Sequence, residues 1–203
     1  MKETEETIME KSKTAELVFI LDESGSMGRF TPDTIKGFND TISEHRGKDE
    51  NIITSVILFN EATKVLYDRV PIDEVPVMTT DDYHPDDRTA LCDAVGTTIN
   101  NILCRQLVDP ADKRPEKTIV FITTDGMENA SKVFSADAVR ELITSAEENC
   151  NWEFVFYGSN FDAVKTARTY GIRAENAMEY ESSHAGYRQM HACRSKKLKD
   201  FLN

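Results

Sequence analysis

The 203-residue chain lacks several features that would place it in a specialised class of protein. No apolar run approaches the roughly 20 residues of a membrane-spanning helix, so we expect no membrane segment. The sequence contains no G-x-x-x-x-G-K-[ST] and no G-x-G-x-x-G pattern, which excludes the phosphate-binding loops built on those glycines. Cysteines are few and form no C-x-x-C pair or Cys/His cluster, so we expect reduced thiols, mostly buried or incidental. They are Cys92, Cys104, Cys150 and Cys193.

Basic residues are also fewer than acidic residues. The chain has 24 Lys and Arg residues against 36 Asp and Glu residues, and its net charge is −12 at pH 7. The field around such a chain repels phosphate backbones, so nucleic acid is a poor candidate partner, whereas cations and basic surfaces are attracted. The first residues, MKETEETIMEKSKTAE, show no apolar core of a secretory signal, and we therefore expect a cytoplasmic protein.

The overall composition suits one globular domain. Apolar residues make up 39% and charged residues 30% of the chain, which suits a folded core and does not suit disorder. We divide the sequence into a charged tail over 1–14, a domain over 15–181, and a C-terminal helix over 182–203 that is packed on the domain or appended to it.

Short apolar runs alternate with segments of helical periodicity through most of the domain. Such alternation predicts a doubly wound α/β fold, in which a mostly parallel sheet is covered by helices on both faces. Thr31 and Asn160 are the expected N-caps of two of the helices, and Gly171 is expected to end the second of these. Buried strands are predicted at 16–21, 52–59, 118–123 and 152–158, and helices at 31–45, from 91 to before Pro110, at 135–149, after 160, and at 183–202.

Two further segments complete the predicted sheet. The segment 63–70 follows the strand 52–59 after three residues, a connection that permits only an antiparallel edge strand. A short edge strand is expected near 177–180. Between the antiparallel strand and the next helix runs a long acid-rich connection, 71–88, and loops of this length in compact domains are often functional.

Carboxylates end two of the buried strands, and these strands are candidates for neighbours in the sheet. Asp22 follows the first apolar run, and Asp125 follows the run at 118–123. Ligands of doubly wound sheets bind beyond the carboxyl ends of the strands, where the strand order reverses. Two carboxylates held close together there are costly unless a proton or a cation lies between them, so a divalent metal ion is the simplest solution.

The residues after Asp22 suit the same ion. Ser24 and Ser26 lie at alternate positions of the turn and direct their hydroxyls back toward Asp22, and Gly25 gives the turn its freedom. Oxygen ligands without Cys or His favour a hard cation, above all Mg²⁺, with Mn²⁺ or Ca²⁺ as alternatives. Two carboxylates leave the metal electrophilic toward one more anionic oxygen, which an Asp or Glu of a partner protein can supply.

The pattern resembles the von Willebrand factor type A domain. Its elements are Asp22-x-Ser24-x-Ser26 after a strand, Thr89 at the start of a helix in "RTAL", and Thr124-Asp125-Gly126 after a later strand. The resemblance covers about 15–181 and implies a metal-ion-dependent adhesion site, a mostly non-catalytic site whose metal takes a carboxylate from a protein partner. It implies direct or water-mediated metal ligands, with Thr89 acting through water, and the full set is Asp22, Ser24, Ser26, Thr89 and Asp125.

One position departs from that family. The family usually has glycine before its threonine, whereas this chain has Arg88, which we expect either to pair with Asp86 or Asp87 or to project toward a partner. Glu128 and Asn129 follow the Thr124-Asp125-Gly126 motif. They either reach the rim of the site or, as we prefer, cap the segment leading to the next helix. A basic cluster on the last helix is expected to be solvated. It comprises Arg188, Arg194, Lys196, Lys197 and Lys199.

Two enzymatic alternatives remain open at this point. "SGSMG" differs by one residue from the G-x-S-x-G turn of serine hydrolases, and Ser26, Asp125 and His184 follow the hydrolase order along the chain. The second alternative is a metal-dependent phosphatase in which Asp22 attacks phosphate. Such enzymes place a second Asp two residues on as general acid, but here that residue is Ser24, which cannot serve at neutral pH.

Overall fold

The structure is a computed structural model that describes residues 14–48, 51–160 and 162–203, so 1–13 of the predicted tail lie outside the described residues. Its centre is a six-stranded sheet with the order β3-β2-β1-β4-β5-β6. Neighbouring strands run parallel except β2 and β3, which are antiparallel, as predicted for this edge. The strands are β1 (Ala15–Asp22), β2 (Ile52–Phe59), β3 (Thr63–Pro71), β4 (Lys117–Thr124), β5 (Trp152–Gly158) and β6 (Ala177–Glu179).

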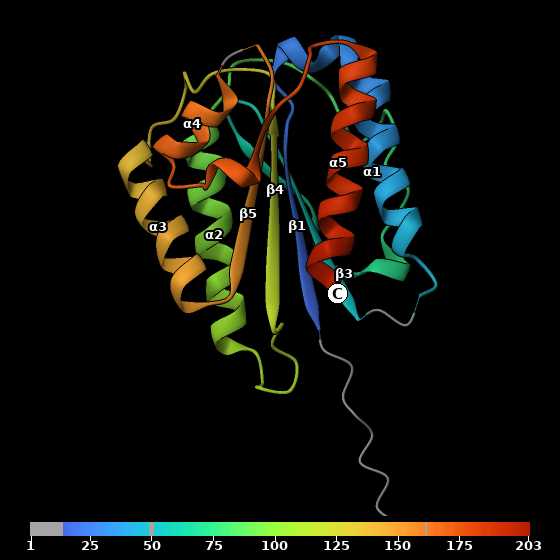
Figure 1. The fold of residues 1–203 in the computed structure, drawn as a ribbon, viewed down its shortest axis with the longest axis vertical. Helices are drawn as coiled ribbons and strands as arrows, with labels where there is room; N and C mark the ends of the chain where they lie inside the picture. Colours follow the sequence, from blue (N-terminus) through green and yellow to red (C-terminus); the bar gives the residue numbers. More distant parts are fainter. Residues whose placement is uncertain (1–13, 49–50, 161) are drawn as a thin grey trace, which may run out of the picture.

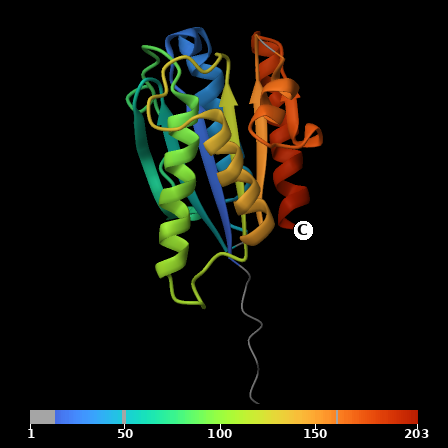
Figure 2. The same cartoon turned by 90° about the vertical axis from the view of Figure 1, so that its left-hand side faces the viewer.

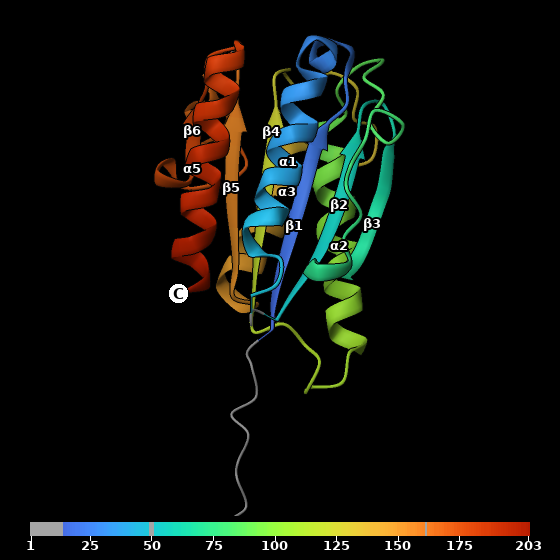
Figure 3. The ribbon, with the colours of Figure 1, turned by 90° about the vertical axis from the view of Figure 1, so that its right-hand side faces the viewer.

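Helices cover both faces of the sheet, which confirms the predicted doubly wound α/β architecture. Figure 1 shows the sheet nearly edge-on, with α1 and α5 on one side and α2, α3 and α4 on the other. Figures 2 and 3 show these two helical layers in turn. The helices are α1 (Thr31–His45), α2 (Leu91–Val108), α3 (Ala136–Asn149), α4 (Ala163–Thr169) and α5 (His184–Leu202). No helix among the described residues is long and apolar enough to cross a membrane.

The central strand β1 explains why its sequence is a continuous apolar run. Successive side chains of a strand point to opposite faces, and both faces of this sheet are covered. Phe19 belongs to the core beneath α1 and α5, whereas Val18 and Ile20 belong to the core beneath α2, α3 and α4. The sheet order places β2 on one side of β1 and β4 on the other. The strand order therefore reverses at β1, and the carboxyl ends of β1 and β4 lie side by side.

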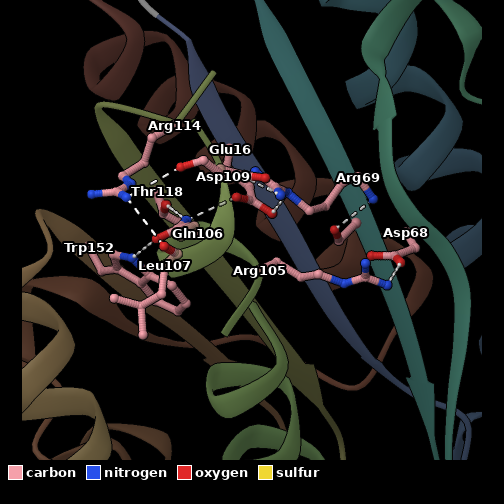
Figure 4. Close-up of polar contacts among 11 residues, drawn as sticks. Glu16, Asp68, Arg69, Arg105, Gln106, Leu107, Asp109, Arg114, Thr118 and Trp152 are labelled. Atoms are coloured by element: carbon pink, nitrogen blue, oxygen red, sulfur yellow. Dashed lines mark hydrogen bonds and ion pairs between the residues drawn. The ribbon is translucent and has the colours of Figure 1, made fainter. Parts of the chain in front are cut away.

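A buried polar network lies at the start of β1, at the end of the sheet opposite the carboxyl ends of β1 and β4 (Figure 4). Gln106 Nε2 donates to Glu16 Oε2 and to Thr118 Oγ1, both at 2.9 Å. Arg69 Nε lies 3.2 Å from Glu16 Oε1, and Arg69 Nη1 lies 2.6 Å from Asp109 Oδ2. Burial raises the pKa of Glu16, while the contacts with Gln106 and Arg69 oppose that rise. The network ties β1, β3 and the end of α2 together, far from the predicted site.

Several local predictions are wrong in detail. Thr31 is the first residue of α1, with Phe30 at the N-cap, because a 3₁₀ turn, η1 (Gly25–Phe30), precedes the helix. Asp162, not Asn160, caps α4, since its side chain accepts from Lys165 N. Gly171, with φ +82°, follows the end of α4 as expected.

The cysteines also differ in part from the expectation. All four are free, but only Cys92 is buried, and Cys104, Cys150 and Cys193 are exposed. Cys92 lies on the buried side of α2, and its thiol is 3.7 Å from Tyr170 Oη. The other three are exposed, so of the two expected kinds of thiol, buried or incidental, only Cys92 is of the buried kind.

Helices α1 and α5 pack closely through small and polar residues. Arg194, predicted to be solvated, is 1% exposed, and its Nη2 donates to Gly37 O (2.8 Å) and Thr41 Oγ1 (3.0 Å). Its guanidinium also lies 5.1 Å from the ring centroid of Phe19. The imidazole of His191 rests on Gly37, where an added Cβ would lie 2.0 Å from the ring. The close approach of the two helices therefore depends on the missing side chain at position 37.

We predict that Gly37→Ala lowers the free energy of unfolding by about 1–3 kcal/mol, because the methyl group overpacks the α1–α5 contact. Urea unfolding followed by circular dichroism measures the loss. Gly28→Ala is the matched control, since a Cβ there meets nothing closer than 3.9 Å. The double variant Gly37→Ala/His191→Ala should recover part of the loss, and a single variant as stable as the wild type would contradict this packing.

Candidate metal centre

Asp22 lies at the carboxyl end of β1 and is fully buried. Its Oδ1 accepts a hydrogen bond from Ser24 N (2.7 Å), and its Oδ2 accepts one from Thr124 Oγ1 (2.5 Å). Tyr83 Oη donates to the main-chain carbonyl of the same residue. These contacts fix the carboxylate at the point where the strand order reverses.

Asp125 follows β4 and faces the same point. Ser26 Oγ donates to Asp125 Oδ1, and Ser24 Oγ lies 3.4 Å from Ser26 Oγ. The second carboxylate oxygen, Asp125 Oδ2, is buried and has no hydrogen-bond partner among the described residues. A buried carboxylate oxygen without a donor is costly, so this atom is poised to accept a cation.

Thr89 lies two residues before the first residue of α2. It is buried, its N–H donates to Asn129 Oδ1 (3.1 Å), and its carbonyl accepts from Asn129 N (3.0 Å). A Cβ on Gly126 would lie 2.9 Å from Thr89 Oγ1 and 3.9 Å from Asp22 Oδ2. Glycine at position 126 therefore leaves room for the threonine hydroxyl beside Asp22.

The end of the long acidic connection is bonded to the turn after β1. Glu23 O accepts from Asp86 N (2.9 Å), and Gly25 N donates to Asp87 O (3.1 Å). Asp87 has φ +62°, a left-handed conformation that Asp tolerates better than most residues. Arg88 pairs with Glu61 (Nε to Oε1, 2.5 Å), so the predicted pairing with Asp86 or Asp87 is wrong. Glu61 lies in the turn between β2 and β3, far from Arg88 in the sequence, so the spacing along the chain did not suggest this pair.

Glu128 caps α2 and does not serve the rim of the site. Its Oε2 accepts from Cys92 N (2.7 Å), and its Oε1 accepts from Ala130 N (2.9 Å) and Ser131 N (2.8 Å). These donors outweigh its burial and lower the pKa of Glu128. The expectation that Glu128 caps the segment leading to the next helix is confirmed by its bonds to Ala130 and Ser131, and its bond to Cys92 also satisfies the first turn of α2.

The two site carboxylates are shifted toward their protonated forms. Burial raises the pKa of Asp22 to about 6, hydrogen bonds from Ser24 and Thr124 oppose the rise, and the charge of Asp125 adds to it. Burial also raises the pKa of Asp125, while Ser26 and the charge of Arg29 lower it. Each carboxylate is therefore more easily protonated than in water, as expected for two acids that share a site without a counter-ion.

The donor set suits a hard cation. All five predicted residues converge at this edge of the sheet, and each offers oxygen. Among the described residues, no three His, Cys, Asp or Glu side chains form a group that could hold a metal ion. A cation held in this part of the chain would therefore depend on two carboxylates supplemented by hydroxyls, a donor set that favours Mg²⁺ over softer metals.

Sequence reasoning missed several residues that hold the site together. Thr124 was noted only as part of a motif, yet its hydroxyl orients Asp22 and accepts from Gly126 N (3.1 Å). Tyr83 lies within an acidic stretch that gave no sign of a buried aromatic side chain. Asn129 is predicted at the rim of the site or, by preference, as a cap, whereas in the structure it holds the backbone of Thr89.

Comparison with known proteins identifies the architecture. No family model and no curated protein sequence matches the chain. Among solved structures, it is similar to proximal thread matrix protein 1 from the mussel byssus with a zinc-occupied MIDAS motif, with a TM-score of 0.64 and 16% identity. The match covers 92% of this chain and 46% of that one.

Two further solved structures agree. The ArnB paralog VWA2 from Sulfolobus acidocaldarius has a TM-score of 0.57 and 13% identity, and the match covers 89% of this chain and 44% of that chain. A von Willebrand factor type A protein from Catenulispora acidiphila has a TM-score of 0.55 and 16% identity, covering 91% and 42%. This chain has the von Willebrand factor type A fold. It spans less than half the length of each of these neighbours.

The strand order brings three distant segments of the chain together at the candidate metal centre. The turn after β1, the start of α2 and the turn after β4 meet at the carboxyl edge of the sheet, where the sequence resemblance also places its motif residues. The observed spacing of Asp22, Thr89 and Asp125 along the chain therefore corresponds to one compact set of oxygens in space.

We predict that the metal-free protein becomes less stable as the pH rises from about 4 to 6. The folded protein holds a proton on Asp22 up to pH about 6, whereas the unfolded chain loses it near 3.8. The stabilisation is complete below the unfolded pKa and is lost as the pH passes the folded pKa. Its size is about 1–3 kcal/mol, at about 1.4 kcal/mol per pKa unit.

Denaturant unfolding in EDTA between pH 4.5 and 7.5 measures this slope. Asp22→Asn should remove most of it, while Asp137→Asn, at an exposed position on α3, should keep it. An Asp22→Asn slope equal to that of the wild type would show that Asp22 does not carry the extra proton.

Proposed function

We propose that this chain is a metal-dependent protein-binding domain that holds a divalent cation between β1 and β4 and takes an acidic side chain of a partner as a further ligand. The observation that carries the proposal is Asp125 Oδ2, a buried carboxylate oxygen to which no described residue donates, beside the hydroxyls of Ser24 and Ser26. The zinc-occupied MIDAS motif of the mussel byssus neighbour supports metal binding at this place in the fold.

The residues that would hold the cation are those predicted from the sequence. Ser24, Ser26 and Asp125 offer oxygens directly to the shared point, and Asp22 and Thr89 complete the set, with Thr89 acting through water. The bound ion would supply an electrophilic position for an anionic oxygen. We favour Mg²⁺, with Mn²⁺ or Ca²⁺ as alternatives, because all the ligands are oxygens.

The chain around the site supports a protein partner that presents Asp or Glu. Two carboxylates neutralise a divalent cation and leave it able to attract one more carboxylate. The neighbouring 71–88 connection carries exposed acids, including Asp81 and Asp86, which would disfavour acidic surfaces that lack a properly placed metal ligand. The free cysteines are compatible with the reducing cytoplasm, where we expect the domain to work.

The geometry gives little support to the enzymatic alternatives. Ser26 Oγ donates directly to Asp125, whereas His184 is exposed and its Nδ1 pairs with Asp33 Oδ2 at 2.6 Å. A serine hydrolase needs the imidazole between the serine and the acid. Both oxygens of Asp22 accept hydrogen bonds and the residue is fully buried, which does not suit a nucleophile that must reach a phosphate.

We predict that the EDTA-treated, dialysed protein binds one equivalent of Mg²⁺ or Mn²⁺ in calorimetry, and that Asp22→Ala and Asp125→Ala each weaken binding at least tenfold. Removal of either carboxylate leaves the cation with half of its compensating charge. The reduced affinity should appear with both metals.

Asp137→Ala serves as the matched control, because that carboxylate lies on the exposed face of α3. It should bind like the wild type, and thermal unfolding should show that all variants remain folded. Wild-type protein that binds neither metal, or folded variants that bind both as tightly as the wild type, would overturn the proposed site.

A further inference from the structure

A group of polar side chains lies beside Asp125, on the side of the site that faces the start of α5. Arg29, in η1, is exposed, and its Nη2 donates to Ser182 Oγ at 2.7 Å. Its guanidinium also lies 4.6 Å from the ring centroid of Phe30. These two contacts hold the cation in place although it is open to solvent.

Asn160 links this group to the metal centre. Its Nδ2 donates to the carbonyl of Asp125 (3.2 Å) and lies 3.5 Å from Ser182 Oγ. It adopts a left-handed backbone conformation, with φ +65°, two residues after the end of β5. A continuous chain of polar contacts therefore runs from Arg29 through Ser182 and Asn160 to the backbone of Asp125, a proposed metal ligand.

The hydrogen bonds of Ser182 and Asn160 connect Arg29 to Asp125, and in agreement with this connection the charge of Arg29 lowers the pKa of Asp125. The guanidinium carries five N–H donors, of which the hydrogen bond to Ser182 uses one. An arginine that served only to neutralise Asp125 would be expected to bond to it directly. Arg29 instead bonds to Ser182, and no other described residue accepts a hydrogen bond from its remaining donors.

The face around the metal centre is thus asymmetric in charge. On the other side of the turn after β1, the backbone of Asp87 is bonded to Gly25, and Asp87 is exposed. Arg88, the neighbouring cation on that side, is occupied by Glu61. A ligand therefore meets a cation toward α5 and carboxylates toward the 71–88 connection.

We propose that Arg29 is a second anchor for the partner's acidic side chain, taking one carboxylate oxygen while the metal ion takes the other. This inference rests on the proposed function, because it assigns the second contact of the same ligand. A guanidinium fork suits a carboxylate better than a single amide or hydroxyl does. The asymmetry also favours a partner in which the acidic residue is accompanied by a basic one that meets Asp87.

The test uses the full chain saturated with Mg²⁺ and the peptide acetyl-Gly-Glu-Gly-amide, titrated by NMR, with acetyl-Gly-Gln-Gly-amide as the uncharged probe. The wild type should bind the Glu peptide and not the Gln peptide. Arg29→Gln should weaken binding of the Glu peptide at least fivefold, while its Mg²⁺ affinity in calorimetry stays the same or tightens. Arg29→Lys should recover only part of the loss, because the ammonium lacks the fork.

Arg188→Gln, at an exposed position on α5, removes the same charge away from the site and should leave both affinities unchanged. Glu-peptide binding by Arg29→Gln equal to that of the wild type would overturn the inference and leave the proposed function intact. Wild-type protein that binds Mg²⁺ but not the Glu peptide would overturn the inference together with the acidic-partner part of the proposal. Absence of Mg²⁺ binding by the wild type would overturn the metal site itself.

Discussion

Two carboxylates buried side by side are the constraint on which this site depends. Asp22 and Asp125 end neighbouring parallel strands, and the fold offers them hydroxyl and backbone donors, but no described residue donates to Asp125 Oδ2. Burial pushes both carboxylates toward protonation, and the charge of Asp125 adds to this effect at Asp22. At neutral pH a bound cation would compensate these buried negative charges. The charges that destabilise the metal-free protein are therefore the ones that would bind the metal.

The rest of the molecule keeps these groups together. Parallel strands covered on both faces fix the place where β1 and β4 end. The hydroxyl of Thr124 orients the side chain of Asp22. The side-chain amide of Asn129 holds the backbone of Thr89. The buried network around Glu16 secures the opposite end of the central strand. Polar groups are thus concentrated at the two ends of an apolar sheet. At one end Glu16 and Asp109 pair with Arg69, whereas at the other end no described residue donates to Asp125 Oδ2, so this second end is the one suited to a ligand.

Much of this arrangement was readable from the sequence, because its signals are local. Unbroken apolar runs predicted the strands, a three-residue connection predicted the antiparallel edge, and motif spacing predicted the five residues that converge on the site. Contacts between distant segments were not readable. The pairing of Arg88 with Glu61 and the burial of Arg194 against α1 arise from tertiary packing, and the 3₁₀ turn that displaces the cap from Thr31 has no strong sequence signal.

We expect one divalent cation to lie among Ser24, Ser26 and Asp125. Crystals of the full chain soaked in Mn²⁺, with data collected at a wavelength where manganese scatters anomalously, would locate it. An anomalous peak should appear within coordinating distance of Asp125 Oδ2 and both serine hydroxyls, and it should be lost in Asp125→Ala. A well-ordered site without a peak, or a peak held by other residues, would show that no cation is held there.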